Sequence, residues 1–251
     1  MFTEERFNII LQELKTKGIV SVTELVKLLD ASESTVRRDL NALHNDGLLK
    51  KIHGGAISIG DNASKHDYKV NVRKNLNIEE KKSIAKKAAS LIHENEIVYL
   101  DAGTTTEFMI NYIEVKNILV VTNGIVHAKK LLEKGIKTFI LGGEVKAVTE
   151  AIVGNNAVED LKKYNFSKGF FGTNGVSNKS GYTTPDVDEA MVKCEAIKRC
   201  SESYVLADES KLEQISFITF GSISDSALIT NKSDQNDYNY DTKVIGVEEN
   251  D

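Results

Sequence analysis

One group of side chains in the sequence is suited to contacts with DNA. Arginine can make a bidentate contact with guanine and asparagine with adenine, while a hydroxyl near a helix N-terminus suits a phosphate. Residues of these types recur at helical spacing between positions 34 and 45, and a lysine and a histidine follow soon after. The candidates are Ser34, Thr35, Arg37, Arg38, Asn41, Lys51 and His53.

A second group of small and polar residues follows the apolar runs of the rest of the chain. In open α/β sheets, ligands bind beyond the carboxyl ends of the strands. Helix N-termini and hydroxyls there suit a phosphate, and an aspartate can accept hydrogen bonds from sugar hydroxyls. Five such strand ends together predict a crevice for a small phosphorylated polyol, with Lys211 as the leading partner for the phosphate. The candidates are Asp101, Gly103, Thr104, Thr105, Thr106, Asn123, Gly142, Gly143, Gly172, Asn174, Gly175, Glu189, Asp208 and Lys211.

Each of these patterns also has a purely structural explanation. Glycine-rich strand ends are common because the chain must turn, an aspartate there is often a helix cap, and the polar face of one helix is ordinarily a solvated surface. The nucleotide-binding fingerprints G-x-x-x-x-G-K-[ST] and G-x-G-x-x-G are absent, so ATP and NAD are disfavoured and no cofactor is expected. Five scattered histidines and two cysteines, Cys194 and Cys200, predict no metal site.

Residues 1–60 predict a winged helix-turn-helix domain that carries the first group. Apolar residues recur at helical spacing over residues 4–15. Ser21 and Glu24 have the spacing of a capping box, which predicts the start of a second helix. Ser32 or Ser34 can cap a third helix, which Gly47 ends. Residues 48–59 predict a short hairpin, the wing.

Residues 61–77 are polar and predict a linker, and residues 78–251 predict an α/β domain with a mainly parallel sheet. The expected strands are 97–100, 118–122, 138–141, 168–172, 204–207, 215–220, 227–230 and 243–247. The expected helices between them are 79–93, 105–113, 126–134, 156–163 and 187–201.

Composition limits the class of protein. The 251 residues are 41% hydrophobic and 27% charged, which is ordinary for a soluble globular protein. A formal net charge of −5 argues against a nonspecific coat on nucleic acid. No apolar run approaches the length of a membrane span, and the N-terminus lacks a basic segment followed by an apolar one. We therefore expect a cytoplasmic protein with no membrane partner.

Taken together, these residues resemble the DeoR family of transcriptional repressors over nearly the whole chain. Residues 32–40 and the later His53-Gly54-Gly55-Ala56 are similar to that family's helix-turn-helix signature and wing. Residues 101–105, 122–123, 142–143 and 207–211 are similar to its effector domain. The family's effector domain is similar in fold to ribose-5-phosphate isomerase and senses phosphorylated sugars.

The resemblance implies a homo-oligomer that binds double-stranded operator DNA, represses a sugar-utilisation operon and is released by a sugar phosphate. Within the family, residues 182–186 are most similar to fructose or lactose operon repressors. Two positions depart from the family pattern. Lys51 stands where an arginine is usual, which keeps the charge but loses bidentate geometry, and Ala31 replaces the usual valine. Both could alter the fit to the operator.

Two other classes of function are compatible with the same residues. A sugar-phosphate isomerase with an appended DNA-binding unit would need a carboxylate base and a cation for the oxyanion, which Glu189, Asp208 and Lys211 could supply. The family resemblance implies loss of catalysis. A plain interaction scaffold would require both groups of residues to be coincidental.

Overall fold

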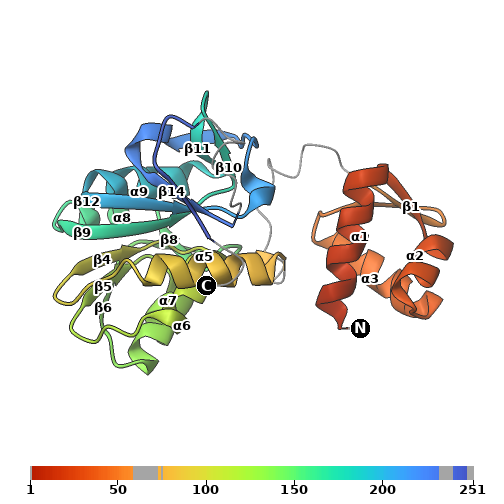
Figure 1. Ribbon diagram of the computed structural model, residues 1–251, viewed down its shortest axis with the longest axis horizontal. Helices are drawn as coiled ribbons and strands as arrows, with labels where there is room; N and C mark the ends of the chain where they lie inside the picture. Colours follow the sequence, from red (N-terminus) through yellow and green to blue (C-terminus); the bar gives the residue numbers. More distant parts are fainter. Residues whose placement is uncertain (1, 59–72, 75, 232–239, 248–251) are drawn as a thin grey trace. The chain divides into compact units, whose positions relative to one another are not determined.

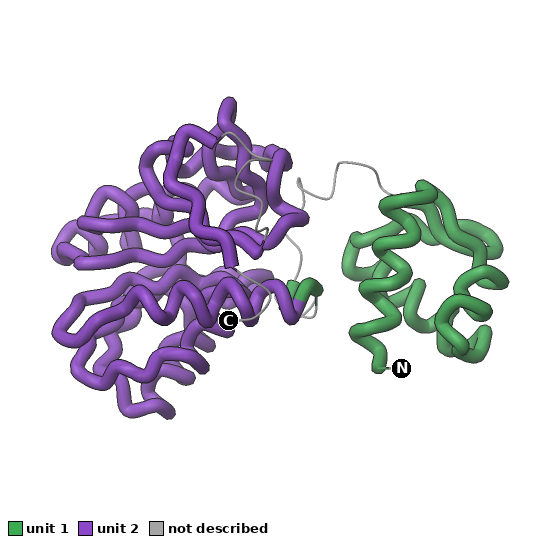
Figure 2. The backbone as a smooth tube through the Cα atoms, in the orientation of Figure 1, with its two compact units in different colours: residues 1–77 green, residues 78–251 purple. Residues whose placement is uncertain are grey.

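The computed structural model describes residues 2–58, 73–74, 76–231 and 240–247. The chain divides into two compact units, residues 1–77 and 78–251 (Figure 2). Each unit has a hydrophobic core of its own. Most of the linker predicted at residues 61–77 lies outside the described residues, as does most of the polar stretch after residue 231. None of the described helices combines the length and apolarity that a membrane span requires.

Over residues 2–58, the N-terminal unit combines helices with short strands (Figure 1). The capping box predicted at Ser21 and Glu24 is present: the Ser21 hydroxyl accepts from the Glu24 N–H at 3.2 Å, and the Glu24 carboxylate accepts from the Ser21 N–H at 2.9 Å. Ser32, not Ser34, caps the third helix. The elements are α1 (Thr3–Lys17), β1 (Ile19–Ser21), α2 (Val22–Leu29), α3 (Glu33–Asn45), β2 (Lys50–Ile52) and β3 (Gly55–Ile57).

The wing is a three-stranded antiparallel sheet in the order β1-β3-β2, whereas the sequence predicted only the hairpin β2-β3. Strand β1 lies between two helices and has three residues, too few to show an alternating pattern. Gly55 makes the pairing possible, because a Cβ at this position would lie 2.1 Å from the Val20 carbonyl oxygen. Any larger residue would therefore separate β3 from β1.

A buried ion pair joins the first and third helices. Arg6 on α1 donates from Nε to Asp39 Oδ2 at 2.6 Å and from Nη2 to Asp39 Oδ1 at 3.1 Å. Arg6 is 7% exposed and Asp39 is 2% exposed, so water screens this pair little. Asp39 thus faces the core of the unit, and the neighbouring Arg38 is exposed.

A seven-stranded parallel sheet forms the centre of the C-terminal unit. From one edge to the other, its strands are β15 (Val244–Gly246), β14 (Ala227–Thr230), β12 (Cys200–Leu206), β9 (Phe166–Gly172), β4 (Ile97–Leu100), β5 (Leu119–Thr122) and β6 (Lys137–Ile140). The helices of this unit are α5 (Ile78–Ala89), α6 (Thr104–Tyr112), α7 (Ile125–Glu133), α8 (Asn155–Leu161) and α9 (Val187–Lys198). Alternate residues of β4 face opposite sides of the sheet: Tyr99 packs with α8 and α9, and Val98 and Leu100 pack with α5, α6 and α7.

The described residues of this unit also form two small antiparallel sheets. One contains β10 (Gly175–Ser177), β11 (Gly181–Thr184) and β13 (Ile218–Gly221), and the other pairs β7 (Glu144–Lys146) with β8 (Ala151–Val153). The strand expected at 215–220 begins only at Ile218 and pairs antiparallel with β11, so it does not extend the parallel sheet. The helix expected at 187–201 ends at Lys198, because Cys200 already belongs to β12.

Candidate functional site

The exposed face of α3 carries the predicted DNA-contacting side chains Ser34, Arg37, Arg38 and Asn41. Arg37 pairs with Glu33 one turn away, with 2.7 Å between Nη2 and Oε1. Arg38 has no hydrogen-bond or ion-pair partner in the parts of the chain that the structure describes. The guanidinium of Arg38 is therefore the one on this face that no carboxylate of the described residues neutralises.

The wing contributes Lys51 and His53 to the same unit. Lys51 on β2 donates from Nζ to the Asn41 side-chain oxygen at 2.5 Å, so the wing strand and α3 present their polar groups together. His53 is exposed in the turn between β2 and β3. Thr35 is only half-exposed, and its hydroxyl lies 2.8 Å from the Ser32 hydroxyl, which assigns it to the start of the helix.

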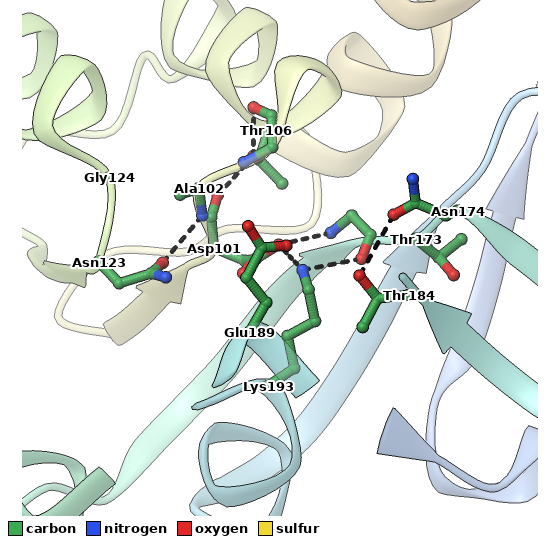
Figure 3. Close-up of polar contacts among 12 residues, drawn as sticks. Asp101, Ala102, Thr106, Asn123, Gly124, Thr173, Asn174, Thr184, Glu189 and Lys193 are labelled. Atoms are coloured by element: carbon green, nitrogen blue, oxygen red, sulfur yellow. Dashed lines mark hydrogen bonds and ion pairs between the residues drawn. The ribbon is translucent and has the colours of Figure 1, made fainter. Parts of the chain in front are cut away.

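In the C-terminal unit, Asp101 follows β4 and lies beside the end of the neighbouring strand β9 (Figure 3). Its Oδ2 accepts from the Gly172 N–H at 3.0 Å and from the Lys193 ammonium. Lys193 also donates to the Gly172 carbonyl at 3.1 Å, and its Nζ lies 5.4 Å from the centre of the Phe220 ring. Asp101 and Lys193 are 1% and 6% exposed. We call Asp101, Gly172 and Lys193 the Asp101 cluster.

Lys193 was not predicted from the sequence. It lies in the interior of α9 and belongs to none of the motifs at the strand ends. The available signal was its spacing: Glu189 and Lys193 are four residues apart and therefore occupy the same side of a helix. The cation beside Asp101 is thus Lys193. Lys211, the predicted phosphate partner, makes no polar side-chain contact with the Asp101 cluster among the described residues.

The turn between β4 and α6 is held by the Thr106 hydroxyl. This oxygen accepts from the Gly103 N–H at 2.9 Å and donates to the Asp101 carbonyl at 2.6 Å. Gly103 is the N-cap of α6 and has no side chain that could cap the helix. The N–H groups of Thr104 and Thr105 meet no acceptor within the described ranges, and the hydroxyls of these two residues form no hydrogen bond there.

Asn123 follows β5 and braces this turn. Its side-chain oxygen accepts from the Ala102 N–H at 2.9 Å (Figure 3), and its amide nitrogen donates to the Ile152 carbonyl at 3.2 Å. Asn123 is buried, so both ends of the amide are used inside the protein. Asn123 is therefore better placed to hold the shape of the turn than to contact a ligand directly.

A second charged group lies at the start of α9. Lys146, on β7, is 3.0 Å from the Asp186 carboxylate and 3.2 Å from the Glu189 carboxylate. Burial opposes ionisation of Asp186, but hydrogen bonds from the Glu189 N–H and from Lys146 outweigh it and lower the pKa of Asp186. Together with the Lys193 and Asp101 pair, this gives two lysines and three carboxylates in ion pairs that involve α9 or the residue before it.

The other predicted ligand residues have different local roles. Asn174 accepts a hydrogen bond of 3.4 Å from Thr184, and a Cβ on Gly175 would lie 2.3 Å from a backbone oxygen. Gly142 donates to a carboxylate of α8, and Gly143 packs against β8.

Asp208 caps the short helix Glu209–Lys211 by accepting from the Ser210 N–H at 3.1 Å. Glu189 pairs with Lys146, as described above. In the described parts of the chain, no polar contact joins Glu189, Asp208 and Lys211 into the base and cation arrangement that an isomerase would need.

His127, in the first turn of α7, is a buried residue of the site that the sequence did not indicate. Its Nε2 lies 3.1 Å from both the Gly103 carbonyl and the Thr106 hydroxyl. Burial lowers the pKa of His127 to about 4, although the carboxylates of Glu107 and Asp101 act in the opposite direction. The imidazole is therefore neutral at pH 7.

This shift predicts a loss of stability in acid. The unfolded chain binds a proton at His127 near pH 6.5, and the folded protein does so only near pH 4. The contribution of the neutral imidazole to the unfolding free energy is therefore complete above pH 6.5 and is lost as the pH falls from 6.5 to 4. The expected loss is on the order of 3 kcal/mol of unfolding free energy. Chemical denaturation at a series of pH values should show this slope for the wild type and a flatter one for His127→Gln. Equal slopes of unfolding free energy against pH for the two proteins would contradict this prediction.

Comparison with known proteins gives one consistent family. Residues 6–62 match a DeoR-like helix-turn-helix domain, and residues 76–232 match a DeoR C terminal sensor domain. The chain is 44% identical over 247 residues to an uncharacterised HTH-type transcriptional regulator FruR of Bacillus subtilis (strain 168), with 98% of each chain covered. It is 36% identical over 242 residues to a lactose phosphotransferase system repressor of Staphylococcus aureus (strain NCTC 8325 / PS 47), with 94% of each covered. Ribose 5-phosphate isomerase A from Methanocaldococcus jannaschii aligns at 17% identity with a TM-score of 0.40, over 53% of this chain and 54% of that one.

Proposed function

The chain belongs to the DeoR family of transcriptional regulators, and from that membership we propose that it represses a sugar-utilisation operon and is released from its operator by a phosphorylated sugar. Its helix-turn-helix domain binds DNA and its sensor domain binds a small effector. The repressor acts as a homo-oligomer, because paired helix-turn-helix units bind half-sites about one helical turn or a multiple apart. It works where the DNA lies, which we expect to be the cytoplasm.

The single observation that carries the DNA-binding part is the unneutralised Arg38 on the exposed face of α3. A bidentate contact from arginine to guanine is worth about 1–3 kcal/mol of discrimination. Arg38→Ala is therefore expected to weaken operator binding about tenfold to a hundredfold. The measurement is a gel-shift titration with DNA selected from a random pool by the wild-type protein, at fixed salt because phosphate contacts make the affinity salt-dependent.

Lys15→Ala provides the matched control for this experiment. Lys15 is an exposed cation of the same unit, but it lies on α1. Its removal changes the net charge by the same amount, so it should reduce operator affinity less than threefold. If Arg38→Ala and Lys15→Ala bound alike, the face of α3 would not be the DNA-contacting surface.

The effector part of the proposal is supported by the turn at the start of α6. Two N–H groups and two hydroxyls of Thr104 and Thr105 are without partners in the described residues, at a helix N-terminus whose dipole favours an anion. The buried Asp101 carboxylate and Lys193 ammonium lie beside this turn (Figure 3). We assign the phosphate of the effector to the turn and its hydroxyl groups to the Asp101 cluster and Glu189.

A thermal-shift panel tests this assignment. The panel contains pentose and hexose phosphates, the corresponding free sugars and inorganic phosphate. A ligand present at about 100 times its dissociation constant stabilises the folded protein by about 2.7 kcal/mol. We expect a shift of this size from one or a few sugar phosphates, none from the free sugars, and release of operator DNA by the same compounds. No shift with any phosphate would contradict the assignment.

A further inference from the structure

His127 contacts the turn at the start of α6 from a neighbouring helix. Its ring nitrogen Nε2 is 3.1 Å from the Gly103 carbonyl oxygen and 3.1 Å from the Thr106 hydroxyl oxygen. His127 is 5% exposed and Thr106 is fully buried. The contact therefore joins α7 to the turn inside the protein, where water does not compete for it.

The partners of Nε2 decide which ring nitrogen carries the proton. A carbonyl oxygen can only accept, so Nε2 must donate to Gly103. The Thr106 hydroxyl gives its proton to a backbone carbonyl, with the Asp101 oxygen at 2.6 Å and the Gly103 oxygen at 2.8 Å, and it too must accept from His127. The neutral imidazole with its proton on Nε2 is the form that satisfies both contacts.

These contacts use the whole hydrogen-bonding capacity of the Thr106 hydroxyl. The oxygen accepts from the Gly103 N–H and from His127, and its one proton is shared by the Asp101 and Gly103 carbonyls. The two backbone segments of the turn are thereby tied to each other and to α7. The N–H groups of Thr104 and Thr105 are held in one orientation without being consumed by any of these bonds.

Gly124 leaves the space that the histidine ring occupies. A Cβ at residue 124 would lie 2.4 Å from Nδ1 of His127 and 2.8 Å from its Cγ. An alanine at this position would force the ring away from the Gly103 carbonyl. Gly124 and His127 therefore act together, and two different substitutions can disturb the same contact.

We propose that His127 is a positioning residue of the sensor domain, which holds the turn of residues 101–106 in the shape that binds the phosphate of the effector. The inference rests on the proposed function, because it assumes that the turn binds a phosphate. His127 itself touches no ligand in this scheme. It acts through Gly103 and Thr106, and its contribution is a prearranged set of donors that need not be ordered at the moment of binding.

Three variants of the full-length protein test the proposal. His127→Leu removes the donor and keeps a side chain of similar bulk, Gly124→Ala displaces the ring, and His127→Gln keeps an N–H donor at a similar reach. Inorganic phosphate is titrated into each protein labelled with 15N, and the dissociation constant is taken from the amide shifts. Hydrogen exchange of the peptide covering residues 101–106 is measured without phosphate.

We expect phosphate to bind His127→Leu and Gly124→Ala at least tenfold more weakly than the wild type, and His127→Gln within threefold of it. Exchange at residues 101–106 should be faster in the first two variants and near normal in the third. Wild-type phosphate affinity in His127→Leu would overturn the proposal. So would a loss of phosphate affinity in His127→Gln as large as that in His127→Leu, since the imidazole ring would then act only by filling space.

Failure of the underlying function has a separate signature. If the wild type binds neither inorganic phosphate nor any sugar phosphate, the phosphate site itself is refuted. The exchange measurement then decides the role of His127 alone, because it needs no ligand. Unchanged exchange at residues 101–106 in His127→Leu would refute the positioning role, and faster exchange would uphold it.

Discussion

Asp39→Ala is expected to unfold much of the N-terminal unit and to abolish operator binding. The substitution leaves the Arg6 guanidinium 7% exposed and without the carboxylate that holds two of its nitrogens. Removing one partner of a buried ion pair costs about 3–5 kcal/mol. A unit of about 60 residues has a total stability of roughly 3–9 kcal/mol, so this loss leaves little or nothing. Hydrogen exchange of the α1 and α3 peptides and a gel shift measure the two effects.

Two further variants separate the buried pair from ordinary surface charge. Glu33→Ala removes a carboxylate from the same helix, but its partner Arg37 is exposed, and the loss should stay below about 1 kcal/mol. The double substitution Arg6→Met with Asp39→Leu replaces both charges by apolar groups and should recover most of the stability. If Asp39→Ala exchanged no faster than Glu33→Ala, the pair would not hold α1 to α3.

Asp101→Ala is expected to remove release by sugar phosphate and to destabilise the sensor domain. Among the described residues, the change leaves the Lys193 ammonium, which is 6% exposed, with only the Gly172 carbonyl and the Phe220 ring as partners. An uncompensated buried charge costs about 3–5 kcal/mol. Stability is measured by chemical denaturation, and release is measured by adding the active sugar phosphate to the protein and DNA complex. The variant should still bind operator, because Asp101 lies outside the helix-turn-helix domain.

Two controls distinguish lost binding from lost stability. Asp101→Ala with Lys193→Met removes both charges, so stability should largely return while release stays absent. Glu96→Ala breaks another ion pair of the same sheet, in which the buried Lys168 has its Nζ 2.6 Å from the half-buried Glu96, at the opposite ends of the strands. It should lower stability and leave release intact. If the sugar phosphate still released operator DNA normally from Asp101→Ala, the role of Asp101 would be limited to shaping the turn.

Much of the fold could be predicted from the sequence because the long elements have strong periodic patterns. The capping box at Ser21 and the strand at Ile97–Leu100 were placed correctly. Strands β1, β7, β8 and β10 have three residues each, too few for alternation to be recognised. Their existence depends on tertiary contacts such as the close approach at Gly55, which local sequence does not encode.

The candidates for the proposed effector site came mainly from strand ends, with Glu189 on α9 as an exception. Asp101 and Gly172 could be foreseen at one edge of the sheet, because parallel strands end on the same side. Lys193 and His127 reach the site from within helices. The four-residue spacing from Glu189 is a weak signal for Lys193, because such pairs are also common on helix surfaces, and the sequence around His127 offers no comparable signal. Asp208 and Lys211 follow a strand too, but Asp208 is a helix cap, which the sequence left open as an alternative.

The sequence separation across the Asp101 cluster has a consequence for the newly made protein. Asp101 meets Gly172 across 71 positions and Lys193 across 92. The last strand of the wing ends at residue 57, whereas the Asp101 cluster cannot form until α9 has left the ribosome. At about 5–20 residues per second, that interval is on the order of ten seconds. During translation, the helix-turn-helix unit of each nascent chain can therefore fold well before the cluster that we propose to bind the effector has formed.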